Sequence, residues 1–396
     1  MNLHLKPIGE FCKTGSGGTP SRKQESKYYN GSIPWVKSGE LRETVILETE
    51  EKITEAALSE TSAKMIPPGA LLVAMYGATV GRIATLGIPA SSNQAVCHIV
   101  PDEAVADQRY MFYALSKQVP KWLDQRVGGA QPNISQHIIR NTQIPLPPIE
   151  EQRRIAAILD KADAVRRKRK EAIALTEELL RSIFLDMFDD ANGNDWEITT
   201  VENIAREQKG SIRTGPFGSQ LLHSEFVDSG IAVLGIDNAV KNEFFWAKPR
   251  YITEDKYEEL KRYKVHPGDV LITIMGTCGR CAIVPDDCSE AINTKHLCCI
   301  TLDRRKCIPE FLHSYFLLHP KARLYLERNA KGAIMDGLNM GIIKKLPIPL
   351  PPVSLQEKFG YIHLKSYALS KKASRLETEE NELFNSLLQR AFRGEL

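Results

Sequence analysis

The stretch that decides the fold occurs twice. Residues 144–155 read IPLPPIEEQRRI and residues 348–359 read IPLPPVSLQEKF, an offset of 348 − 144 = 204 in a chain of 396 residues. The shared register continues without a gap as far as Phe188 and Phe392. It pairs Gln152 with Gln356, Leu179 with Leu383 and Ser182 with Ser386. A repeat of this length predicts two large units rather than a solenoid of short ones.

Composition sets wide limits. A length of 396 residues is enough for two domains, each with its own core. Hydrophobic residues make up 42% and charged residues 26%, which is typical of a globular protein. Apolar runs such as residues 70–75 are too short to span a membrane, and residues 1–7 do not resemble a signal peptide. We therefore expect a cytoplasmic protein. The net charge of +3 neither requires nor excludes a nucleic-acid partner.

Two local clusters have simple interpretations. The basic run at residues 166–170 lies in a helical stretch and is typical of a solvated helix face. Six of the eight cysteines lie between Cys278 and Cys307, but Cys298 and Cys299 are adjacent and lack the spacing of a zinc site. We therefore expect reduced, partly buried thiols and neither a metal nor a cofactor.

A long helix is predicted after each proline-rich segment. Residues 149–188 contain no glycine or proline and are rich in strong helix formers. Apolar residues spaced alternately by four and three predict a helix–helix seam, and the second helix shows the same frame. The helices are expected to pair as an antiparallel coiled coil; alternatively, each packs on its own globular half. The predicted seam residues are Ile158, Val165, Ala172, Leu179, Ile183, Ile362, Leu369, Leu376, Leu383 and Leu387.

The globular halves repeat more loosely. Residues 68–82 and 267–280 each predict an apolar strand followed by a glycine turn that ends in arginine. Downstream, Asn93 is paired with Asn293. Strands alternate with helical segments, so the predicted fold class is α/β (α+β), with two similar mixed domains. The expected domains are residues 1–147, the central helix 148–190, residues 191–351, and the C-terminal helix 352–396.

Taken together, these motifs resemble the specificity subunit of type I restriction-modification systems. The resemblance covers the whole chain and rests on motifs that recur in order: residues 17–21 with 31–36, residues 215–219, both Gly-Arg turns, and both IPLPP-x3-Gln helix starts. It implies two target recognition domains, each reading one part of a bipartite DNA site, held by the paired helices with pseudo-two-fold symmetry. It also implies docking of two methyltransferase subunits and, through the complex, of restriction subunits that act in phage defence.

Candidate DNA contacts follow from comparing the halves, because shared residues suit phosphate contacts and differing residues can read bases. Arg82 and Arg280 are the predicted phosphate contacts, unless each closes its turn with a carboxylate. Asn93 and Asn293 could contact adenine or phosphate, or order their own loops. The predicted readers are polar loop residues: Lys37, Ser38, Arg42, Gln94, Gln131, Asn133 and Gln136 in the first half, and Arg213, Gln220, Asn238, Lys241, Lys295, His296 and Lys331 in the second.

No catalytic site is predicted. The sequence lacks both the glycine-rich cofactor loop and the Asn/Asp-Pro-Pro-aromatic motif of an adenine methyltransferase, and it lacks the closely spaced acid and lysine of a nuclease core. Two alternatives stay open beside the specificity subunit. The chain could serve a fused nuclease-methyltransferase instead of separate subunits, or it could be a coiled-coil scaffold that does not read DNA.

Overall fold

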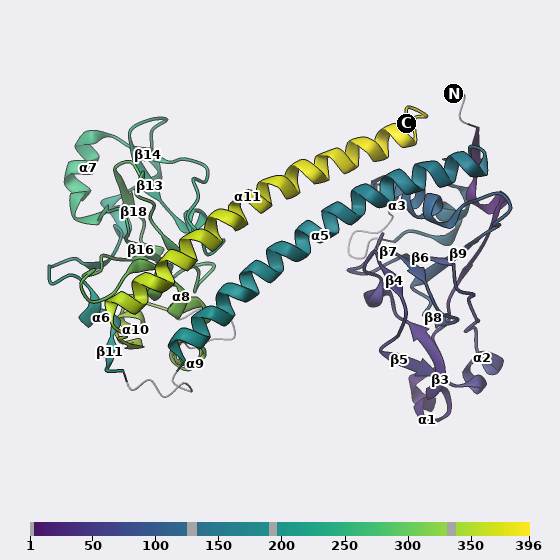
Figure 1. Ribbon diagram of the computed structural model, residues 1–396, viewed down its shortest axis with the longest axis horizontal. Helices are drawn as coiled ribbons and strands as arrows, with labels where there is room; N and C mark the ends of the chain where they lie inside the picture. Colours follow the sequence, from purple (N-terminus) through teal and green to yellow (C-terminus); the bar gives the residue numbers. More distant parts are fainter. Residues whose placement is uncertain (1–3, 125–132, 190–195, 331–337) are drawn as a thin grey trace. The chain divides into compact units, whose positions relative to one another are not determined.

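Two long helices begin directly after the two proline-rich repeats (Figure 1). Helix α5 spans Ile149–Phe188 and helix α11 spans Val353–Ala391. Proline lacks a backbone N–H and suits the first turn of a helix, so the Pro-Pro pairs mark the junction. The computed structural model describes residues 4–124, 133–189, 196–330 and 338–396. It divides the chain into a first unit, Met1–Lys170 with Arg375–Leu396, and a second unit, Glu171–Ser374.

Each unit contains the start of one long helix and the end of the other, running in opposite directions. In the first unit, Arg154 near the start of α5 donates to the backbone oxygen of Leu396, whereas Arg169, further along α5, pairs with Glu380. In the second unit, Phe184 at the end of α5 packs against Phe359 at the start of α11, with ring centroids 5.1 Å apart. The predicted antiparallel arrangement is therefore present within each unit.

The first unit combines three sheets. A five-stranded sheet has the order β2-β9-β6-β7-β4, a three-stranded sheet the order β5-β3-β8, and β1 pairs with β10. Its strands are β1 Leu5–Pro7, β2 Cys12–Ser16, β3 Tyr29–Val36, β4 Val45–Ile46, β5 Glu51–Ile53, β6 Leu71–Ala74, β7 Ile83–Leu86, β8 Ser91–Ser92, β9 Val96–Pro101 and β10 Gln143–Pro145. Its shorter helices are α1 Glu25–Tyr28, α2 Glu55–Glu60, α3 Gln108–Asp124 and α4 Gln136–Asn141.

The second unit repeats this plan. Its four-stranded sheets have the orders β12-β19-β16-β17 and β14-β13-β18-β15, and β11 pairs with β20. Its strands are β11 Ile198–Thr200, β12 Ile212–Thr214, β13 Ile231–Leu234, β14 Tyr251–Ile252, β15 Lys264–Val265, β16 Val270–Thr273, β17 Cys281–Ile283, β18 Ala291–Asn293, β19 Leu297–Ile300 and β20 Pro347–Pro349. Its shorter helices are α6 Val201–Ile204, α7 Glu254–Leu260, α8 Pro309–Leu318, α9 Pro320–Asn329 and α10 Met340–Lys344.

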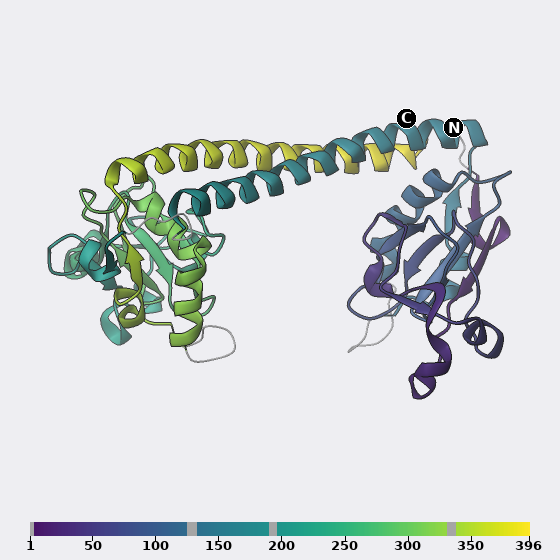
Figure 2. The same ribbon diagram turned by 60° about the horizontal axis from the view of Figure 1, so that its bottom comes forward.

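The two units share the topology of most of their strands, although β4 of the first unit and β15 of the second have no counterpart strand. The order β2-β9-β6-β7 matches β12-β19-β16-β17, and the parallel pair β3–β8 matches β13–β18. In the second unit, α8 and α9 flank the sheet (Figure 2), and buried Phe311 of α8 joins the core with Phe184, Phe188 and Phe359. The predicted pair of similar mixed α/β domains is confirmed.

A buried glutamine ties α5 to the globular part of the first unit. Gln152 is fully buried and makes three hydrogen bonds. Its side-chain oxygen accepts from the backbone N–H of Asp107 at 2.9 Å, and its amide group donates to the carbonyls of Val105 (2.9 Å) and Pro147 (2.8 Å). Because a buried amide must have its polar atoms bonded, this residue fixes the first turn of the helix against the segment before α3.

The repeat partner of this glutamine does the same in the second unit. Gln356 is also fully buried. It accepts from the N–H of Ile308 at 3.0 Å and donates to the carbonyls of Lys306 (3.0 Å) and Pro351 (2.8 Å). The sequence paired the two glutamines but did not reveal that they anchor the helices.

The helix seam differs from its prediction. Half of the predicted seam is only partly buried: Ile158, Ile183, Ile362, Leu376 and Leu387. The other half is exposed: Val165, Ala172, Leu179, Leu369 and Leu383. The fully buried position is Leu159 rather than Ile158, and the partly buried positions that follow include Ile173 and Leu180. The frame on α5 is therefore displaced by one residue, which turns the predicted positions toward solvent.

Candidate nucleic-acid interface

In the first unit, loop segments from distant parts of the sequence meet at one end of the sheets. Strands β2, β3 and β8 all finish there. The N–H of Gly18 donates to the carbonyl of Ser92 at 2.8 Å, and the N–H of Asn93 donates to the carbonyl of Val36 at 2.9 Å. These backbone bonds join the predicted reader loops after β3 and β8 into one surface.

Two more segments join the same surface. The N–H of Met75, just after β6, donates to the carbonyl of Ala95 at 2.8 Å, and its own carbonyl accepts from the N–H of Ile134 at 2.7 Å. Tyr76 and Asn133 form an isolated β-bridge beside them. The Gly-Arg turn and the residues before α4 therefore lie next to the reader loops.

The second unit assembles its loops through corresponding bonds. The N–H of Gly215 donates to the carbonyl of Thr294 at 3.2 Å, and the N–H of Thr294 donates to the carbonyl of Leu234 at 2.9 Å. The N–H of Ile274, after β16, donates to the carbonyl of His296 at 2.9 Å. Each unit thus presents the same set of loops at the same end of its sheets.

Close backbone approach explains a glycine in each unit. A Cβ atom on Gly17 would lie 2.2 Å from the carbonyl oxygen of Ser92, and one on Gly215 would lie 1.8 Å from that of Asn293. Both neighbours are backbone atoms that cannot move aside. Only glycine fits at these two positions.

The Gly-Arg turns have the backbone that their glycines suggest. Gly77 and Gly81 have φ of +82°, and Gly276 and Gly279 have φ of +71° and +78°. This left-handed region is one that glycine occupies without strain. The carbonyls of Arg82 and Arg280 accept from Ala74 and Thr273, each at 2.9 Å, while both arginines are exposed. Neither has a carboxylate partner in the described ranges, so the turn-closing alternative finds no support there.

The reader candidates after β3 differ in their charge environment. The Lys37 ammonium group lies 2.7 Å from a carboxylate oxygen of Glu50 and 3.1 Å from one of Glu51, so its charge is balanced within the protein. The hydrogen bonds that Lys37 donates to Glu50 and then to Glu51 raise its pKa. Ser38 is partly exposed, and Arg42 is exposed. Of these three candidates, Arg42 offers the available positive charge.

The remaining first-unit candidates are amide side chains. Gln94 is exposed and its side-chain oxygen accepts from the hydroxyl of Thr19. Asn133 is exposed, and Gln136 donates to the hydroxyl of Thr14 at 3.4 Å. Gln131 lies outside the described residues.

In the second unit, four candidates reach the surface. Gln220 is exposed and accepts from the hydroxyl of Tyr263 at 2.9 Å, and Lys241 is exposed above the ring of Phe245. Lys295 and His296 are partly exposed in the turn between β18 and β19. Burial, followed by the charges of Lys295 and Arg250, lowers the pKa of His296, so its ring is neutral at pH 7. Lys331 lies outside the described residues.

Three predicted contacts have structural roles instead. Arg213 is 8% exposed and its guanidinium lies 2.7 Å from the Asp269 carboxylate. Asn238 is buried and accepts from the N–H of Gly235 at 2.8 Å. Asn293 is fully buried and donates to the carbonyl of Leu297 at 3.1 Å. Because these side chains are enclosed and bonded, they leave the set of surface candidates.

The predicted pairing of Asn93 with Asn293 is also wrong by one residue. The N–H of Asn93 bonds the carbonyl of the last residue of β3, and the residue with the corresponding bond to β13 is Thr294. Asn93 is partly exposed, although its side-chain oxygen is buried without a partner in the described part of the chain.

One charged residue beside the interface was missed. Arg250 forms an ion pair with Asp237, which lies in the short 3-10 helix Ile236–Asn238 directly after β13. Asp237 lies two residues after Gly235, and Arg250 lies against that glycine. Nothing in the sequence near Arg250 resembles a motif of the first half, so internal comparison gave no signal for it.

The cysteines of the second unit are free thiols. Cys281, Cys298, Cys299 and Cys307 are all buried, and burial raises the pKa of Cys298 to about 12. Across residues 4–124, 133–189, 196–330 and 338–396, no three His, Cys, Asp or Glu side chains are grouped as metal ligands. Over the same ranges, no helix combines the length and apolar character needed to cross a bilayer.

Fold and loop geometry agree with the comparisons with known proteins. The family model for the type I restriction modification DNA specificity domain matches residues 3–175 and 228–369. Since these ranges make up most of the chain, the protein belongs to this family of type I restriction-modification specificity subunits.

Several relatives are similar over long stretches. The chain is 26% identical to the type I restriction enzyme EcoBI specificity subunit of Escherichia coli, over 78% of this chain and 70% of the relative. It is 30% identical to the EcoR124I/EcoR124II specificity subunit over 46% of this chain and 45% of that one. The MjaVIII specificity subunit of Methanocaldococcus jannaschii is 22% identical, over 96% of this chain and 91% of the relative.

Solved structures share the fold. A type I restriction-modification S subunit from M. genitalium matches with a TM-score of 0.58 at 14% identity, covering 99% of this chain and 96% of that one. A chain from a structure of the type I R-M system, which concerns complex assembly and conformational transition, matches with a TM-score of 0.56 at 19% identity. The match covers 100% of this chain and 98% of that one.

Proposed function

We propose that this chain is the DNA-reading subunit of a type I restriction-modification complex and that each unit reads one part of an asymmetric bipartite site. The observation that carries the proposal is the pair of equivalent loop surfaces. Their backbone bonds correspond, but their exposed polar side chains differ. Loops with the same backbone arrangement but different side chains are suited to reading two different base sequences.

Phosphate contacts and base contacts separate within this surface. Arg82 and Arg280 stand at corresponding turns, are exposed and lack a carboxylate partner among the described residues, so they suit a phosphate that both units meet. The base readers are drawn from exposed or partly exposed side chains that the halves do not share: Ser38, Arg42, Gln94, Asn133 and Gln136 in the first unit, and Gln220, Lys241, Lys295 and His296 in the second. Lys37 contributes less because Glu50 and Glu51 balance its charge.

The long helices supply the docking surface for two methyltransferase subunits, through which restriction subunits join the complex. Large apolar side chains stay exposed on them: Val165, Leu175 and Leu179 on α5, and Tyr361, Leu364, Leu369 and Leu383 on α11. Several large exposed apolar side chains on one element favour a protein partner. In this role the chain itself performs no chemistry and binds no cofactor.

Methylation mapping tests the proposal. The chain is expressed with its methyltransferase in cells that lack other methylation, and modified bases are located by long-read sequencing. The expected result is a single gapped, asymmetric motif with methyl-adenine on each strand. A continuous palindrome, or no motif at all, would contradict the proposal.

Two alternatives remain distinguishable. Co-purification separates a fused nuclease-methyltransferase partner from separate subunits by the size of the bound chain. A gel shift with the partner present separates a reader from a scaffold. A reader prefers one bipartite duplex and loses affinity as salt rises, whereas a scaffold prefers none.

A further inference from the structure

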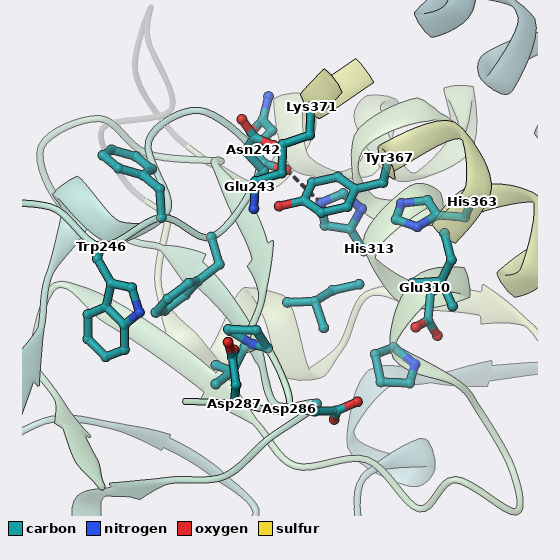
Figure 3. A pocket seen from close by; sticks show the side chains of 18 residues that line it. Asn242, Glu243, Trp246, Asp286, Asp287, Glu310, His313, His363, Tyr367 and Lys371 are labelled. Carbon is teal, nitrogen blue, oxygen red and sulfur yellow. Dashed lines mark hydrogen bonds between the residues drawn. The ribbon is translucent and has the colours of Figure 1, made fainter. Parts of the chain in front are cut away.

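The second unit contains a cavity of about 470 Å³ next to the start of α11. Helix α8, helix α11 and the two loops 242–246 and 283–287 form its walls. Figure 3 shows Tyr367, His313 and His363 together on one wall, Trp246 at the opposite side, and Glu310, Asp286 and Asp287 along a third side. One wall, loop 242–246, follows directly after Lys241, one of the proposed base readers, and Lys241 lies over the ring of Phe245. Strand β17 meets the cavity at Ile283, its end away from the Gly-Arg turn.

Aromatic rings and neutral imidazoles form much of the wall. Phe244 and Trp246 pack edge to face with centroids 5.3 Å apart, and Trp246 remains 49% exposed. The Nε2 atom of His313 bonds the carbonyl of Asn242 at 2.9 Å. Burial lowers the pKa of His313, and burial followed by the nearby His313 lowers the pKa of His363 to about 4. Both rings are therefore neutral at pH 7.

The charged groups of the cavity are unbalanced. Four carboxylates line it, those of Glu243, Asp286, Asp287 and Glu310, against a single lysine, Lys371. None of the four carboxylates forms a hydrogen bond or ion pair within the described ranges. Lys371 lies over the ring of Tyr367, 5.2 Å from its centroid. A cavity with aromatic walls and excess carboxylate attracts a cation on an apolar stem.

The corresponding place in the first unit already holds such a cation. Asp107 and Ile308 donate equivalent bonds to the two anchoring glutamines, so Arg109 and Glu310, two residues further on, occupy corresponding positions. The Arg109 guanidinium bonds the Asp160 carboxylate and the Tyr113 hydroxyl.

The Arg109 guanidinium also lies over aromatic rings, 5.0 Å from the ring centroid of Phe112 and 5.1 Å from that of Tyr113. The second unit has a carboxylate where the first has this arginine. By the 204-residue offset it also has Leu364 where the first has Asp160. At the positions of Phe112 and Tyr113 the second unit has His313 and Ser314, so its cavity takes its aromatic rings and carboxylates from other residues, and the internal guanidinium is missing.

We propose that the cavity binds the guanidinium group of an arginine side chain presented by a protein partner that packs along α11. Glu310 would take the guanidinium in a bidentate pair, and Trp246 and Tyr367 would enclose its stem. That this partner is the methyltransferase subunit rests on the proposed function. The preference of the cavity for a guanidinium is independent of the proposed function.

The first test uses the full chain and agmatine, a guanidinium on a four-carbon stem, with binding followed by calorimetry. Saturable binding is expected. Glu310→Arg, which copies the first unit, should weaken it at least about tenfold because it fills the site from within. Glu254→Arg makes the same charge change on exposed α7 and should leave it unchanged. Absence of binding to the unaltered chain, or equal binding to Glu310→Arg, would overturn the proposal.

The second test identifies the source of the guanidinium. Glu310→Arg should lower the affinity of the co-expressed methyltransferase for the chain, relative to Glu254→Arg, without changing the methylated motif. If agmatine binding is lost but partner affinity is not, the cavity takes a free organic cation and the docking assignment is overturned. A failure of the proposed function would appear separately, as loss of the gapped motif with both variants and with the unaltered chain.

Discussion

The two units agree atom for atom where the long helices join the globular parts, and they differ where side chains meet solvent. Gln152 and Gln356 make the same three bonds to corresponding backbone groups. Close by, Arg109 in the first unit is replaced by Glu310 in the second, and a closed polar network becomes an open cavity. The comparison teaches that the repeat preserves the junction while the surfaces around it are free to specialise.

The largest expected effect comes from removing the anchoring glutamines. Gln152→Leu and Gln356→Leu should each lower the free energy of unfolding by about 3 kcal/mol, because each removes the side-chain partner of one N–H and two carbonyls that are buried or partly buried. Thermal unfolding and hydrogen exchange at the amides of Asp107 and Ile308 measure the loss. Gln94→Leu, at an exposed position, is the matched control. A difference between the two units larger than the loss itself would show that the junctions are not equivalent.

A second effect concerns a buried histidine of the second unit. Burial lowers the pKa of His363 from 6.5 to about 4, and His313, Glu310 and Tyr367 surround it (Figure 3). Between these two pH values the unfolded chain binds a proton that the folded chain does not, so the free energy of unfolding falls as the pH falls. The loss should be on the order of 2 kcal/mol between pH 7 and pH 4.5.

The first unit provides the variant that checks this effect. His363 corresponds by the 204-residue offset to Leu159. In His363→Leu, unfolding of the second unit should depend less steeply on pH between 6.5 and 4.5, as measured by calorimetry at several pH values. His137→Leu, at an exposed position of the first unit, should leave the pH dependence unchanged. An unaltered slope in His363→Leu would mean that another group sets the acid sensitivity.

The sequence predicted the secondary structure and the two-unit organisation better than the helix seam and the surface residues. The long helices, the strands before the Gly-Arg turns and the two-unit plan follow from local patterns that the repeat shows twice. The seam could not be fixed in the same way, because apolar residues occupy two adjacent frames on α5: Leu159, Ile173 and Leu180 in one, and Ile158, Val165 and Leu179 in the other. Periodicity alone does not choose between frames one residue apart.

Tertiary partners explain the misplaced contact residues. Arg213 is buried because Asp269, far along the chain and directly before β16, pairs with its guanidinium. Asn293 is buried because the carbonyl of Leu297 turns back to accept its amide. In each case the local sequence is that of an exposed loop residue, and only the tertiary partner shows that the side chain is buried. Arg82 and Arg280 were selected as candidates because their glycine turns recur in both halves, and both side chains are exposed.

A smaller effect tests whether the two Gly-Arg turns contribute equally to DNA binding. Arg82→Ala and Arg280→Ala should each weaken DNA binding about tenfold, uniformly across sequences, and lower the slope of log affinity against log salt by about one. Filter binding at several salt concentrations, with the partner present, measures both. Arg323→Ala on α9, whose guanidinium pairs with Glu327, is the control. A change in preferred sequence would instead make the altered arginine a base reader.

The smallest expected effect concerns an ion pair between the two long helices in the first unit. Arg169 pairs with Glu380 at 3.1 Å, but the other carboxylate oxygen of Glu380 is buried without a partner among the described residues. The offset places Thr176 and Ala373 at the corresponding positions of the second unit. A partly buried pair with one unsatisfied oxygen gains little over such neutral residues, because desolvation offsets most of the attraction.

The double variant Arg169→Ala with Glu380→Thr copies that neutral pair into the first unit. It should change the free energy of unfolding by less than about 1 kcal/mol. Either single variant should cost more than the double, since each leaves one charge unpaired, and a double-mutant cycle by chemical denaturation measures the difference. If the double variant proved as costly as the singles, the ion pair would be a stabilising feature of the first unit. The two ends of the helix pair would then differ in stability as well as in sequence.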